Sequence, residues 1–494
     1  MRFAVLGEIE SLEPWQARCL QELARLPQVR LVAPAAGSSL QQLELDFILS
    51  WTDPPAELIS LPRYGVWKYE FGDWTNYRGE PAGFWEVHQH ETVSAAMLVR
   101  PTSDPDAVIV LREGYLRTNL LSAAANRRQL QRCCALWATQ LIADIGNGVV
   151  ARFTAEPRRA GSRPRLPPTR GQLLQHACRI AARLVLKAAS DLFRHEQWNV
   201  GIVEQPIAAF LGSADRAATR WLPDPRPEEI RADPFGLVKD GRLTVLCEHL
   251  SFEDSRGVIV AVEPAAGTQM SHRPVSIGPS PAVHLSYPFL LEVGGRTFCM
   301  PETHEAAEVS LYEVERFPDR WRKLATLLSN TVIVDASLFS HGGLWWLAGS
   351  EAAPKGANCE LHLWYATEMT GPWRAHPGNP VKIDVRSARP GGTPFVHAGV
   401  LYRPAQDCSR TYGGRILINR VLTLTPTAFQ EETAAQVDPD ISGPYPEGLH
   451  TLSAVGAVTL IDGKRIRFIP AQFARTLRSW FSVAFGKRRR PVSG

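Results

Sequence analysis

Three carboxylates between residues 233 and 335 stand at the ends of apolar strands in similar segments. Asp233 opens an apolar strand in Ala-Asp-Pro-Phe, and Asp335 does so in Asp-Ala-Ser-Leu-Phe. Glu302 ends a strand in Met-Pro-Glu-Thr. Carboxyl groups held near one another can act as acid and base, as in the chemistry of glycosidic bonds. These three residues are the catalytic candidates, with capping of turns as the structural alternative.

The segments around these residues form a repeat. Copies start near residues 233, 287, 335, 393 and 450, and each has two apolar strands around a turn, with Asp462-Gly463 as the expected turn of the last copy. A period of about 50 residues with this content is typical of a β-propeller. We therefore predict an all-β, five-bladed propeller over residues 196–470. The starts of its innermost strands should meet at one end of the central channel.

Other polar residues of the repeat would bind the ligand at that end. Short acidic side chains accept hydrogen bonds from neighbouring hydroxyl groups of a sugar. Arginine side chains can bind the carboxylate or phosphate of a charged sugar. Arginines that tie blades together are the alternative. The predicted ligand-binding residues are Glu248, Tyr287, Arg389, Arg403, Gln406, Asp407, Tyr412 and His450. No metal site and no cofactor follows from the sequence.

The first 120 residues have a different pattern of predicted strands and helices. Apolar strands near 3–7, 45–51 and 65–69 enclose a helical pattern at 14–26. Strands that alternate with a helix predict a small α/β domain with a parallel sheet.

One family resemblance is carried by residues 64–73, by residues 77–87 with Pro81, and by Asp106. In these segments the sequence resembles formyltransferases that use 10-formyltetrahydrofolate. The resemblance implies a formyltransferase-like fold for residues 1–120. It also implies a degenerate site, because Lys68 and Glu70 stand where the family has Asn and His. Lys68 and Glu70 should form a salt bridge on one strand face. The degenerate site comprises Lys68, Glu70, Arg78 and Asp106.

Segments of the repeat resemble the N-terminal propeller of glucosamine inositolphosphorylceramide transferases and its bacterial counterparts. They include Arg231-Ala-Asp-Pro-Phe, Ser286-Tyr-Pro-Phe and Tyr402-Arg-Pro-Ala-Gln-Asp-Cys. The propeller also resembles family 43 glycoside hydrolases, although Ser286-Tyr287 replaces the second-blade Asp of that family. The resemblance implies glycosyl transfer or cleavage, with a glycan, sugar nucleotide or glycolipid as partner. The alternatives are a non-catalytic glycan-binding module and an N-formyltransferase acting on an amino sugar.

Two further segments are basic. Residues 121–195 should be a helical linker region, with an exposed stretch at 158–170 and a helix at 172–193 that packs between domains. Residues 471–494 form an amphipathic pattern that ends in Lys487-Arg-Arg-Arg490. Such a tail either docks on its own protein or makes peripheral contact with an anionic membrane through 471–490.

The composition is that of an ordinary soluble protein, with 45% hydrophobic and 21% charged residues in a chain of 494. The eight cysteines follow no disulfide or zinc spacing, and the N-terminus lacks a signal-peptide pattern. We therefore expect a cytoplasmic protein, peripheral to the inner face of the membrane if the tail binds lipid. Without interleaved aromatics, the basic stretch does not predict a nucleic-acid partner.

Overall fold

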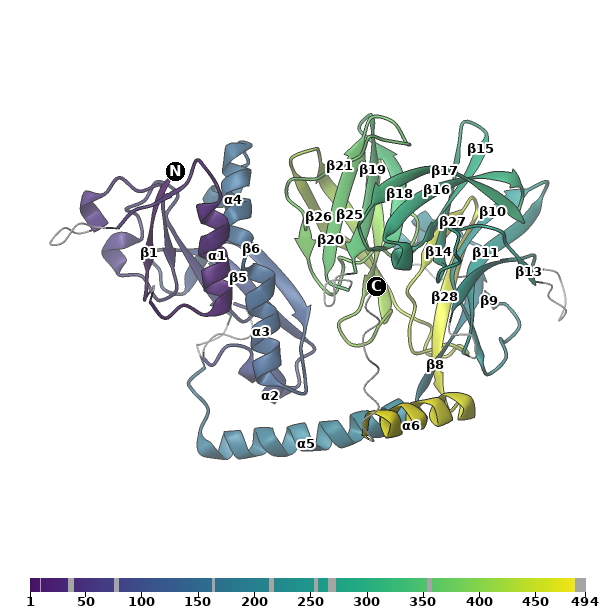
Figure 1. Cartoon of the computed structure of the whole chain (residues 1–494), viewed down its shortest axis with the longest axis horizontal. Coiled ribbons are helices and arrows are strands. Elements are labelled where there is room, and N and C mark those ends of the chain that lie inside the picture. The colour runs from purple at the N-terminus through teal and green to yellow at the C-terminus, as the bar shows by residue number, and fades with distance from the viewer. Residues whose placement is uncertain are drawn as a thin grey trace. The chain divides into compact units, whose positions relative to one another are not determined.

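The computed structural model contains two compact units (Figure 1). It describes residues 1–8, 10–33, 40–74, 80–161, 165–212, 217–252, 256–264, 272–352 and 358–484. The first unit comprises Met1–Ala181 and Pro426–Ala428, and the second comprises Ala182–Thr425 and Phe429–Gly494. Arg78 and the basic cluster at 487–490 lie outside the described residues.

The first unit is built on one mixed seven-stranded sheet with the order β2-β1-β3-β4-β5-β6-β7. Its strands are β1 (Arg2–Leu6), β2 (Arg30–Leu31), β3 (Phe47–Ser50), β4 (Val66–Phe71), β5 (Val93–Pro101), β6 (Ala107–Arg117) and β7 (Arg158–Arg159). The first four strands pair parallel with one another, whereas the pairs β4–β5, β5–β6 and β6–β7 are antiparallel. The predicted parallel sheet is therefore limited to β1–β4. The strands β5 and β6 extend it antiparallel within residues 1–120, and β7 lies in the expected linker region.

Five helices accompany this sheet in the sequence: α1 (Pro14–Ala24), α2 (Phe84–Gln89), α3 (Ala123–Cys134), α4 (Trp137–Gly146) and α5 (Arg170–Phe193). The start of α1 follows from local chemistry, because Pro14 occupies its first turn and Glu13 forms a capping box with Gln16. Ser122 caps α3 by accepting a hydrogen bond from Ala125 N. The region expected to be a helical linker therefore begins with two helices, α3 and α4.

The second unit is a five-bladed β-propeller, which confirms the prediction. Blade 1 contains β10 (Glu229–Lys239), β11 (Arg242–Ser251), β12 (Gly257–Val262) and β13 (His272–Pro274). Blade 2 contains β14 (Ser286–Val293), β15 (Arg296–Glu302), β16 (Glu308–Arg316) and β17 (Arg320–Ser329). Blade 3 contains β18 (Ile333–His341), β19 (Leu344–Glu351), β20 (Glu360–Ala366), β21 (Arg374–Ala375) and β22 (Lys382–Ile383). Blade 4 contains β23 (Phe395–His397), β24 (Val400–Asp407), β25 (Arg415–Leu424) and β26 (Phe429–Val437).

Blade 5 joins the two ends of the propeller sequence. It has the order β27-β28-β8-β9, from β27 (Leu452–Val455), β28 (Val458–Arg467), β8 (His195–Val203) and β9 (Arg220–Trp221). The antiparallel pairing of β28 with β8 runs from Thr459 opposite Val203 to Arg467 opposite His195. The ring is therefore closed by hydrogen bonds between strands from the start and the end of the propeller sequence.

The first strands of blades 1 to 3 share a β-bulge at the start of the repeat. The register shifts after Ala232, Ser286 and Val334. The next residues, Asp233, Tyr287 and Asp335, have φ values of 53°, 42° and 51°. A left-handed backbone conformation is strained at a residue other than glycine. A β-bulge changes the direction in which the side chain of the bulged residue points. These positions match three predicted copies of the repeat.

The last two copies of the repeat, in blades 4 and 5, differ from the first three at this position. In blade 4, Gly392 takes this place with φ of 130°, where a Cβ would lie 1.9 Å from the carbonyl oxygen of Leu452. In blade 5 the turn lies at Gly456, with φ of 60°, between β27 and β28. The predicted turn at Asp462-Gly463 was wrong, because both residues lie inside β28.

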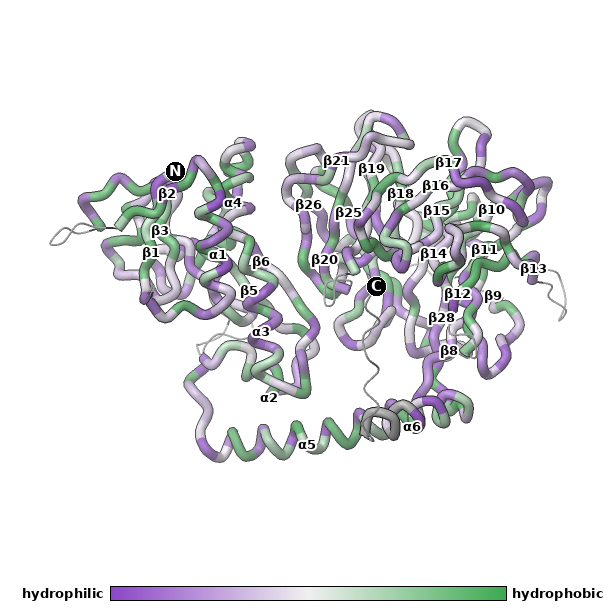
Figure 2. Tube along the Cα trace, in the orientation of Figure 1, coloured by the Kyte–Doolittle hydropathy of each residue, from purple (hydrophilic) through white to green (hydrophobic). Residues whose placement is uncertain are grey.

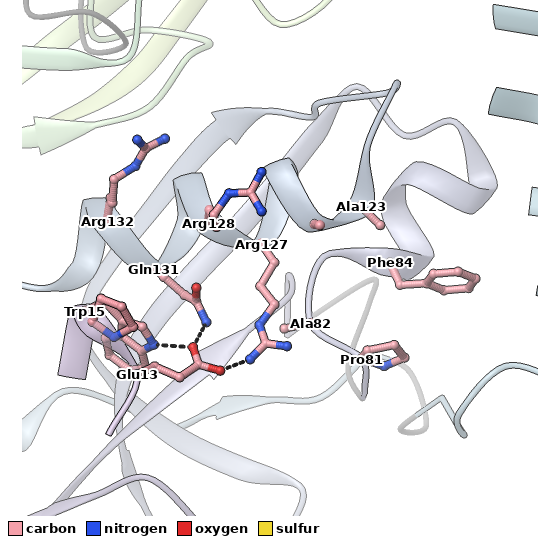
Figure 3. Close-up of a pocket in the computed structure, with 12 residues that line it drawn as sticks. Glu13, Trp15, Pro81, Ala82, Phe84, Ala123, Arg127, Arg128, Gln131 and Arg132 are labelled. Atoms are coloured by element: carbon pink, nitrogen blue, oxygen red, sulfur yellow. Dashed lines mark hydrogen bonds and ion pairs between the residues drawn. The ribbon is translucent and has the colours of Figure 1, made fainter. Parts of the chain in front are cut away.

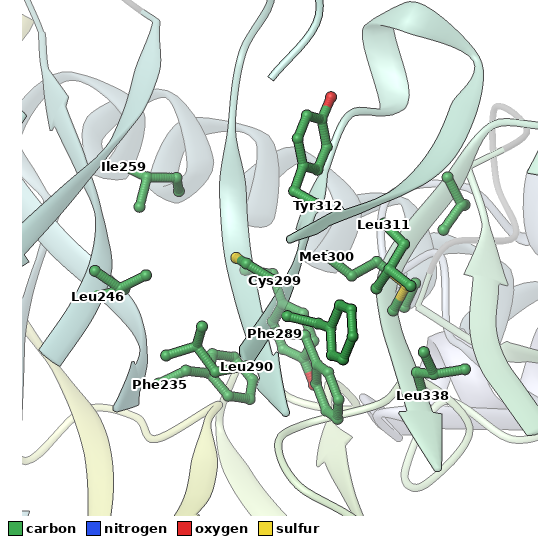
Figure 4. Close-up of a cluster of buried hydrophobic side chains, with 14 of the residues drawn as sticks. Phe235, Leu246, Ile259, Phe289, Leu290, Cys299, Met300, Leu311, Tyr312 and Leu338 are labelled. Carbon is green, nitrogen blue, oxygen red and sulfur yellow. The ribbon is translucent and has the colours of Figure 1, made fainter. Parts of the chain in front are cut away.

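Buried side chains from neighbouring blades form the propeller core. Figure 4 shows Phe235 and Leu246 of blade 1 near Phe289 and Leu290 of blade 2. The first strands of successive blades also contact one another, β10 with β14 and β14 with β18. Residues at the bulges therefore face the interior of the ring.

Helices α5 and α6 (Pro470–Ala484) carry exposed apolar side chains. In Figure 2 the colour along α5 alternates between green and purple, as an amphipathic helix requires. No described residue of α5 is buried, and Leu174 and Val185 are 69% and 70% exposed. The helix expected at 172–193 is thus present as α5, and its packing between domains stays a prediction. None of the described helices is long and apolar enough to cross a membrane.

Candidate functional site

One group of channel residues surrounds His450, which precedes β27. The Nδ1 atom of His450 lies 2.6 Å from Asp462 Oδ2, and its Nε2 atom lies 3.4 Å from Asp233 Oδ1. All three side chains are buried. We call Asp233, His450 and Asp462 the histidine cluster.

Backbone and hydroxyl donors complete the histidine cluster. Asp462 accepts hydrogen bonds from the backbone N–H groups of Asp233, His450 and Thr451, at 3.1, 2.9 and 3.0 Å. Asp233 accepts one from Thr451 Oγ1 at 3.0 Å and one from Tyr287 N at 3.3 Å. Both carboxylates therefore have protein donors on each of their oxygens.

The pKa values of the histidine cluster move in different directions. Burial raises the pKa of Asp233 well above its usual range, while the charge of His450 opposes this shift. Burial alone would raise the pKa of Asp462 and lower that of His450. Their mutual attraction instead lowers the pKa of Asp462 and, with Asp233, raises that of His450 to about 9. At neutral pH the imidazole is therefore a cation between two carboxyl groups.

A second group of channel residues surrounds Arg389, in the loop before β23. Arg389 Nε donates to Asp335 Oδ2 at 2.5 Å, and Gln406 Nε2 donates to the same oxygen at 2.6 Å. Glu302 Oε2 accepts a hydrogen bond from Asp335 N at 3.0 Å. We call Glu302, Asp335, Arg389 and Gln406 the arginine cluster.

The two carboxyl groups of the arginine cluster also differ in pKa. Burial raises the pKa of Asp335, although Arg389 opposes the shift. Burial would raise the pKa of Glu302 too, but a hydrogen bond from His304 and the charge of Arg389 lower it overall. His304 Nδ1 lies 2.7 Å from Glu302 Oε1. Glu302 is therefore the carboxylate that stays ionised.

Tyr412 connects the two clusters, and Tyr287 links the histidine cluster to Ser337 of blade 3 and to Gly392 before blade 4. Tyr412 stacks edge-on against His450, with ring centroids 5.3 Å apart, and its hydroxyl accepts a hydrogen bond from Arg389 Nη2 at 3.3 Å. The hydroxyl of Tyr287 accepts a hydrogen bond from Gly392 N at 2.7 Å and lies 3.1 Å from Ser337 Oγ. The histidine cluster, the arginine cluster and both tyrosines together form what we call the channel network.

The remaining predicted residues lie at its edge or elsewhere. Glu248 Oε1 is 3.2 Å from His284 Nε2, and this histidine ring is 5.8 Å from His304. Arg403 bonds to Glu431 and to the carbonyl groups of Ser387 and Ala388 within blade 4. Asp407 Oδ1 accepts the backbone N–H of Ser409. Glu431 also pairs with Lys382 of blade 3, so Arg403 has the contacts of an arginine that ties blades together, and Asp407 caps a turn. Ligand binding by either residue stays a prediction.

Sequence reasoning missed several members of this site. Asp462 was interpreted as a turn residue, although a charged side chain in the apolar run Val458-Thr-Leu-Ile was a signal of a buried partner. Lys464 was also missed. It is 1% exposed and donates to Thr411 Oγ1 at 2.9 Å and Tyr412 O at 2.6 Å, which fixes the loop that carries Tyr412.

The histidine cluster has the spacing of a metal site, since one ligand atom from each of its residues lies within 4.8 Å of the others. Its chemistry fits a cation poorly. A metal-bound histidine is neutral, whereas both nitrogens of His450 face carboxyl groups and its pKa is raised. The imidazolium already supplies the positive charge.

In the first unit, Lys68 Nζ lies 2.5 Å from Glu70 Oε1 and also pairs with Asp53, so the predicted salt bridge is confirmed. Asp106 is an exposed turn residue whose N–H donates to Asp104 Oδ1 at 3.0 Å. The mixed sheet alone does not establish a formyltransferase-like fold.

Part of the propeller is similar to a known family. Residues 218–442 match the family profile described as glucosamine inositolphosphorylceramide transferase 1, N-terminal. The transferase of that name from Arabidopsis thaliana is 34% identical over 209 residues, which cover 42% of this chain and 27% of the relative. Its counterpart from Oryza sativa subsp. japonica is also 34% identical, over 42% of this chain and 28% of the relative. The chain thus spans just over a quarter of these relatives.

Solved structures give weaker matches. A family 117 glycoside hydrolase from Zobellia galactanivorans is 13% identical, with a TM-score of 0.36 over 56% of this chain and 91% of the hydrolase. A GH43_1 enzyme from Xanthomonas citri is 12% identical, with a TM-score of 0.33 over 47% of this chain and 87% of the enzyme. The family profile remains the informative match: it contains Asp233 and the whole arginine cluster, and it ends before His450 and Asp462.

Proposed function

We propose that the propeller is a carbohydrate-active domain that catalyses glycosyl transfer or cleavage on a glycan or glycolipid precursor at its channel network. One observation carries the proposal. Buried carboxyl groups from four blades, Asp233, Glu302, Asp335 and Asp462, have pKa values displaced in opposite directions. Carboxyl groups whose pKa values are displaced in opposite directions can serve as acid and base in one site.

Asp233 is the proposed proton donor to the glycosidic oxygen, because its raised pKa favours the protonated acid. Glu302 is ionised because its pKa is lowered, and it is the proposed base that takes a proton from the attacking water or acceptor hydroxyl. Asp335 is fixed by Arg389 and Gln406, so it suits the orientation of a bound sugar. The names of the relatives give the first substrates to test, an amino-sugar donor and an inositolphosphoceramide acceptor.

The experiment is an assay of the full chain with UDP-amino sugars and inositolphosphoceramide, and with simple glycolipids for cleavage, read by mass spectrometry. We expect Asp233→Asn to lower turnover at least about a hundredfold, as for loss of a general acid. Asp240→Asn is the matched control, since Asp240 is an exposed residue of the same hairpin with φ of 49°. Turnover that is equal in the two variants would contradict the role of Asp233.

A non-catalytic glycan-binding propeller is the second candidate. It is favoured by the internal hydrogen bonds to both oxygens of Asp233 and of Asp462, which leave few acceptor positions for a substrate. Calorimetric binding of an oligosaccharide without product from any donor would support it. Product that depends on Asp233 would exclude it.

Formyl transfer by the first unit is the third candidate. Lys68 forms ion pairs with both Glu70 and Asp53. Neither Lys68 nor Glu70 is therefore free to take a proton from an amine. Incubation with 10-formyltetrahydrofolate and amino-sugar nucleotides should therefore yield no formylated product. A formylated product would restore this candidate.

We also propose that the second unit is cytoplasmic and contacts an anionic membrane through α6. This helix has no acidic residue and carries Arg475 and Arg478, and Trp480 is 39% exposed. The docking alternative has its own support, because Phe473 contacts the ring of Phe193 at 5.4 Å. Flotation with phosphatidylserine vesicles should be lost when residues 471–494 are deleted. Equal flotation of the shortened chain would favour docking.

A further inference from the structure

The first unit contains a cavity that none of the roles above uses. Its volume is about 540 Å³, within the range of small-molecule sites. It lies where the start of α1, the loop before α2 and one side of α3 meet (Figure 3). Its lining consists of Glu13, Pro14, Trp15, Pro81, Ala82, Phe84, Ala123, Ala124, Arg127, Arg128, Gln131 and Arg132.

Three arginines of α3 give the cavity a basic wall. Arg127 is ion-paired with Glu13, which also accepts hydrogen bonds from Gln131 at 2.5 Å and from Trp15 Nε1 at 3.0 Å (Figure 3). Arg128 and Arg132 are exposed and have no acidic partner among the residues that the structure describes. They are four residues apart on a helix, so their side chains are neighbours.

The opposite wall is apolar and fixed. Trp15 is 7% exposed and lies at one end of this wall, whereas Phe84 is 5% exposed and lies with Pro81 at the other end (Figure 3). The indole N–H of Trp15 is bonded to Glu13, which holds the ring in place. A planar, weakly polar group would pack against such aromatic and proline surfaces.

We propose that this cavity binds a phosphorylated small molecule with a planar ring, of the nucleoside diphosphate class. The guanidinium groups of Arg128 and Arg132 would each take one phosphate, with the bidentate geometry that arginine offers. The ring would pack on Phe84 and Pro81 at one end of the apolar wall (Figure 3). The proposal depends on the first unit alone and does not rest on the function proposed for the propeller.

The test is isothermal titration calorimetry of the full chain with UDP, GDP and ADP, and with pyrophosphate and the free nucleosides as half-ligands. At least one nucleoside diphosphate should bind ten or more times as tightly as either of its halves. The double variant Arg128→Gln/Arg132→Gln should weaken that binding at least tenfold. Arg18→Gln, which removes an exposed arginine from α1, is the matched control and should change it less than twofold.

A second variant keeps the charge and fills the space. Ala124 is exposed on α3, so Ala124→Trp should leave the helix folded while it blocks the cavity. We expect this variant to lose the nucleotide and keep the circular dichroism spectrum of the parent. Each of the following results would overturn the proposal: no binding of any of the three nucleotides at millimolar concentration, pyrophosphate bound as tightly as the nucleotides, or unchanged binding by either variant.

Discussion

The channel network contains two clusters that share a plan and differ in their cation. In the histidine cluster, His450 lies between Asp233 and Asp462. In the arginine cluster, Arg389 binds Asp335, whose backbone N–H is bound by Glu302. Each cluster holds one carboxyl group with a raised pKa and one with a lowered pKa.

The difference between the cations determines how each cluster responds to its surroundings. Arginine keeps its charge at every pH that a folded protein meets, whereas an imidazolium loses its charge near its pKa. The pKa of His450 is about 9. The arginine cluster should therefore be a permanent tie between blades, and the histidine cluster a tie that alkaline conditions release.

Removal of the permanent cation should have the largest effect. Arg389→Gln leaves the buried Asp335 without its counter-charge, and loss of one partner of a buried pair costs about 3–5 kcal/mol. We expect that loss in urea unfolding at pH 9, and a smaller loss at pH 6, because without Arg389 the buried Asp335 can take up a proton. Arg374→Gln, at an exposed arginine of β21, is the control. A loss no larger than that of the control would contradict the comparison.

The pH dependence of stability should come from the histidine cluster. Because the pKa of His450 is raised in the fold, its contribution is complete below about pH 6.5 and is lost as pH rises through about 9. The free energy of unfolding should fall over this window by at most about 3 kcal/mol, at 1.36 kcal/mol for each pH unit. His450→Gln should flatten the profile, and His397→Gln on the exposed part of β23 should not. An unchanged slope in His450→Gln would place the titration elsewhere.

The neutral hydrogen bonds of the Tyr287 hydroxyl should matter least. Tyr287→Phe removes the acceptor of the buried Gly392 N–H, and an unsatisfied buried donor costs about 1–3 kcal/mol. We expect this loss to be independent of pH between 6 and 9. Tyr365→Phe, at a half-buried tyrosine of β20, should change stability little. An effect as large as that of Arg389→Gln would mean that the ionic ties are not the main ones.

Much of this architecture could be predicted from the residues. The repeat revealed the five blades and the positions of Asp233, Tyr287 and Asp335, because a bulge at the same point of each first strand requires similar sequences there. The pairing of Lys68 with Glu70 followed from strand geometry.

The histidine cluster could be predicted only in part. Asp-Gly is a strong hairpin signal, so Asp462-Gly463 was interpreted as a turn. In the fold, Gly463 is needed because a Cβ there would lie 2.3 Å from the ring of Trp221. Asp462 is needed because His450 requires a counter-charge. Both reasons come from residues distant in sequence, which a local pattern does not contain.

Blade 5 has a consequence for the order of synthesis. β8 is made first, and its partner β28 begins at Val458, some 250 residues after β8 ends at Val203. At about 5–20 residues per second, β8 waits on the order of 10 to 50 s for that partner. During this time its open edge can accept β28 from a second copy of the chain. The closure of the ring is thus also the point at which two nascent chains could exchange strands and form a swapped dimer.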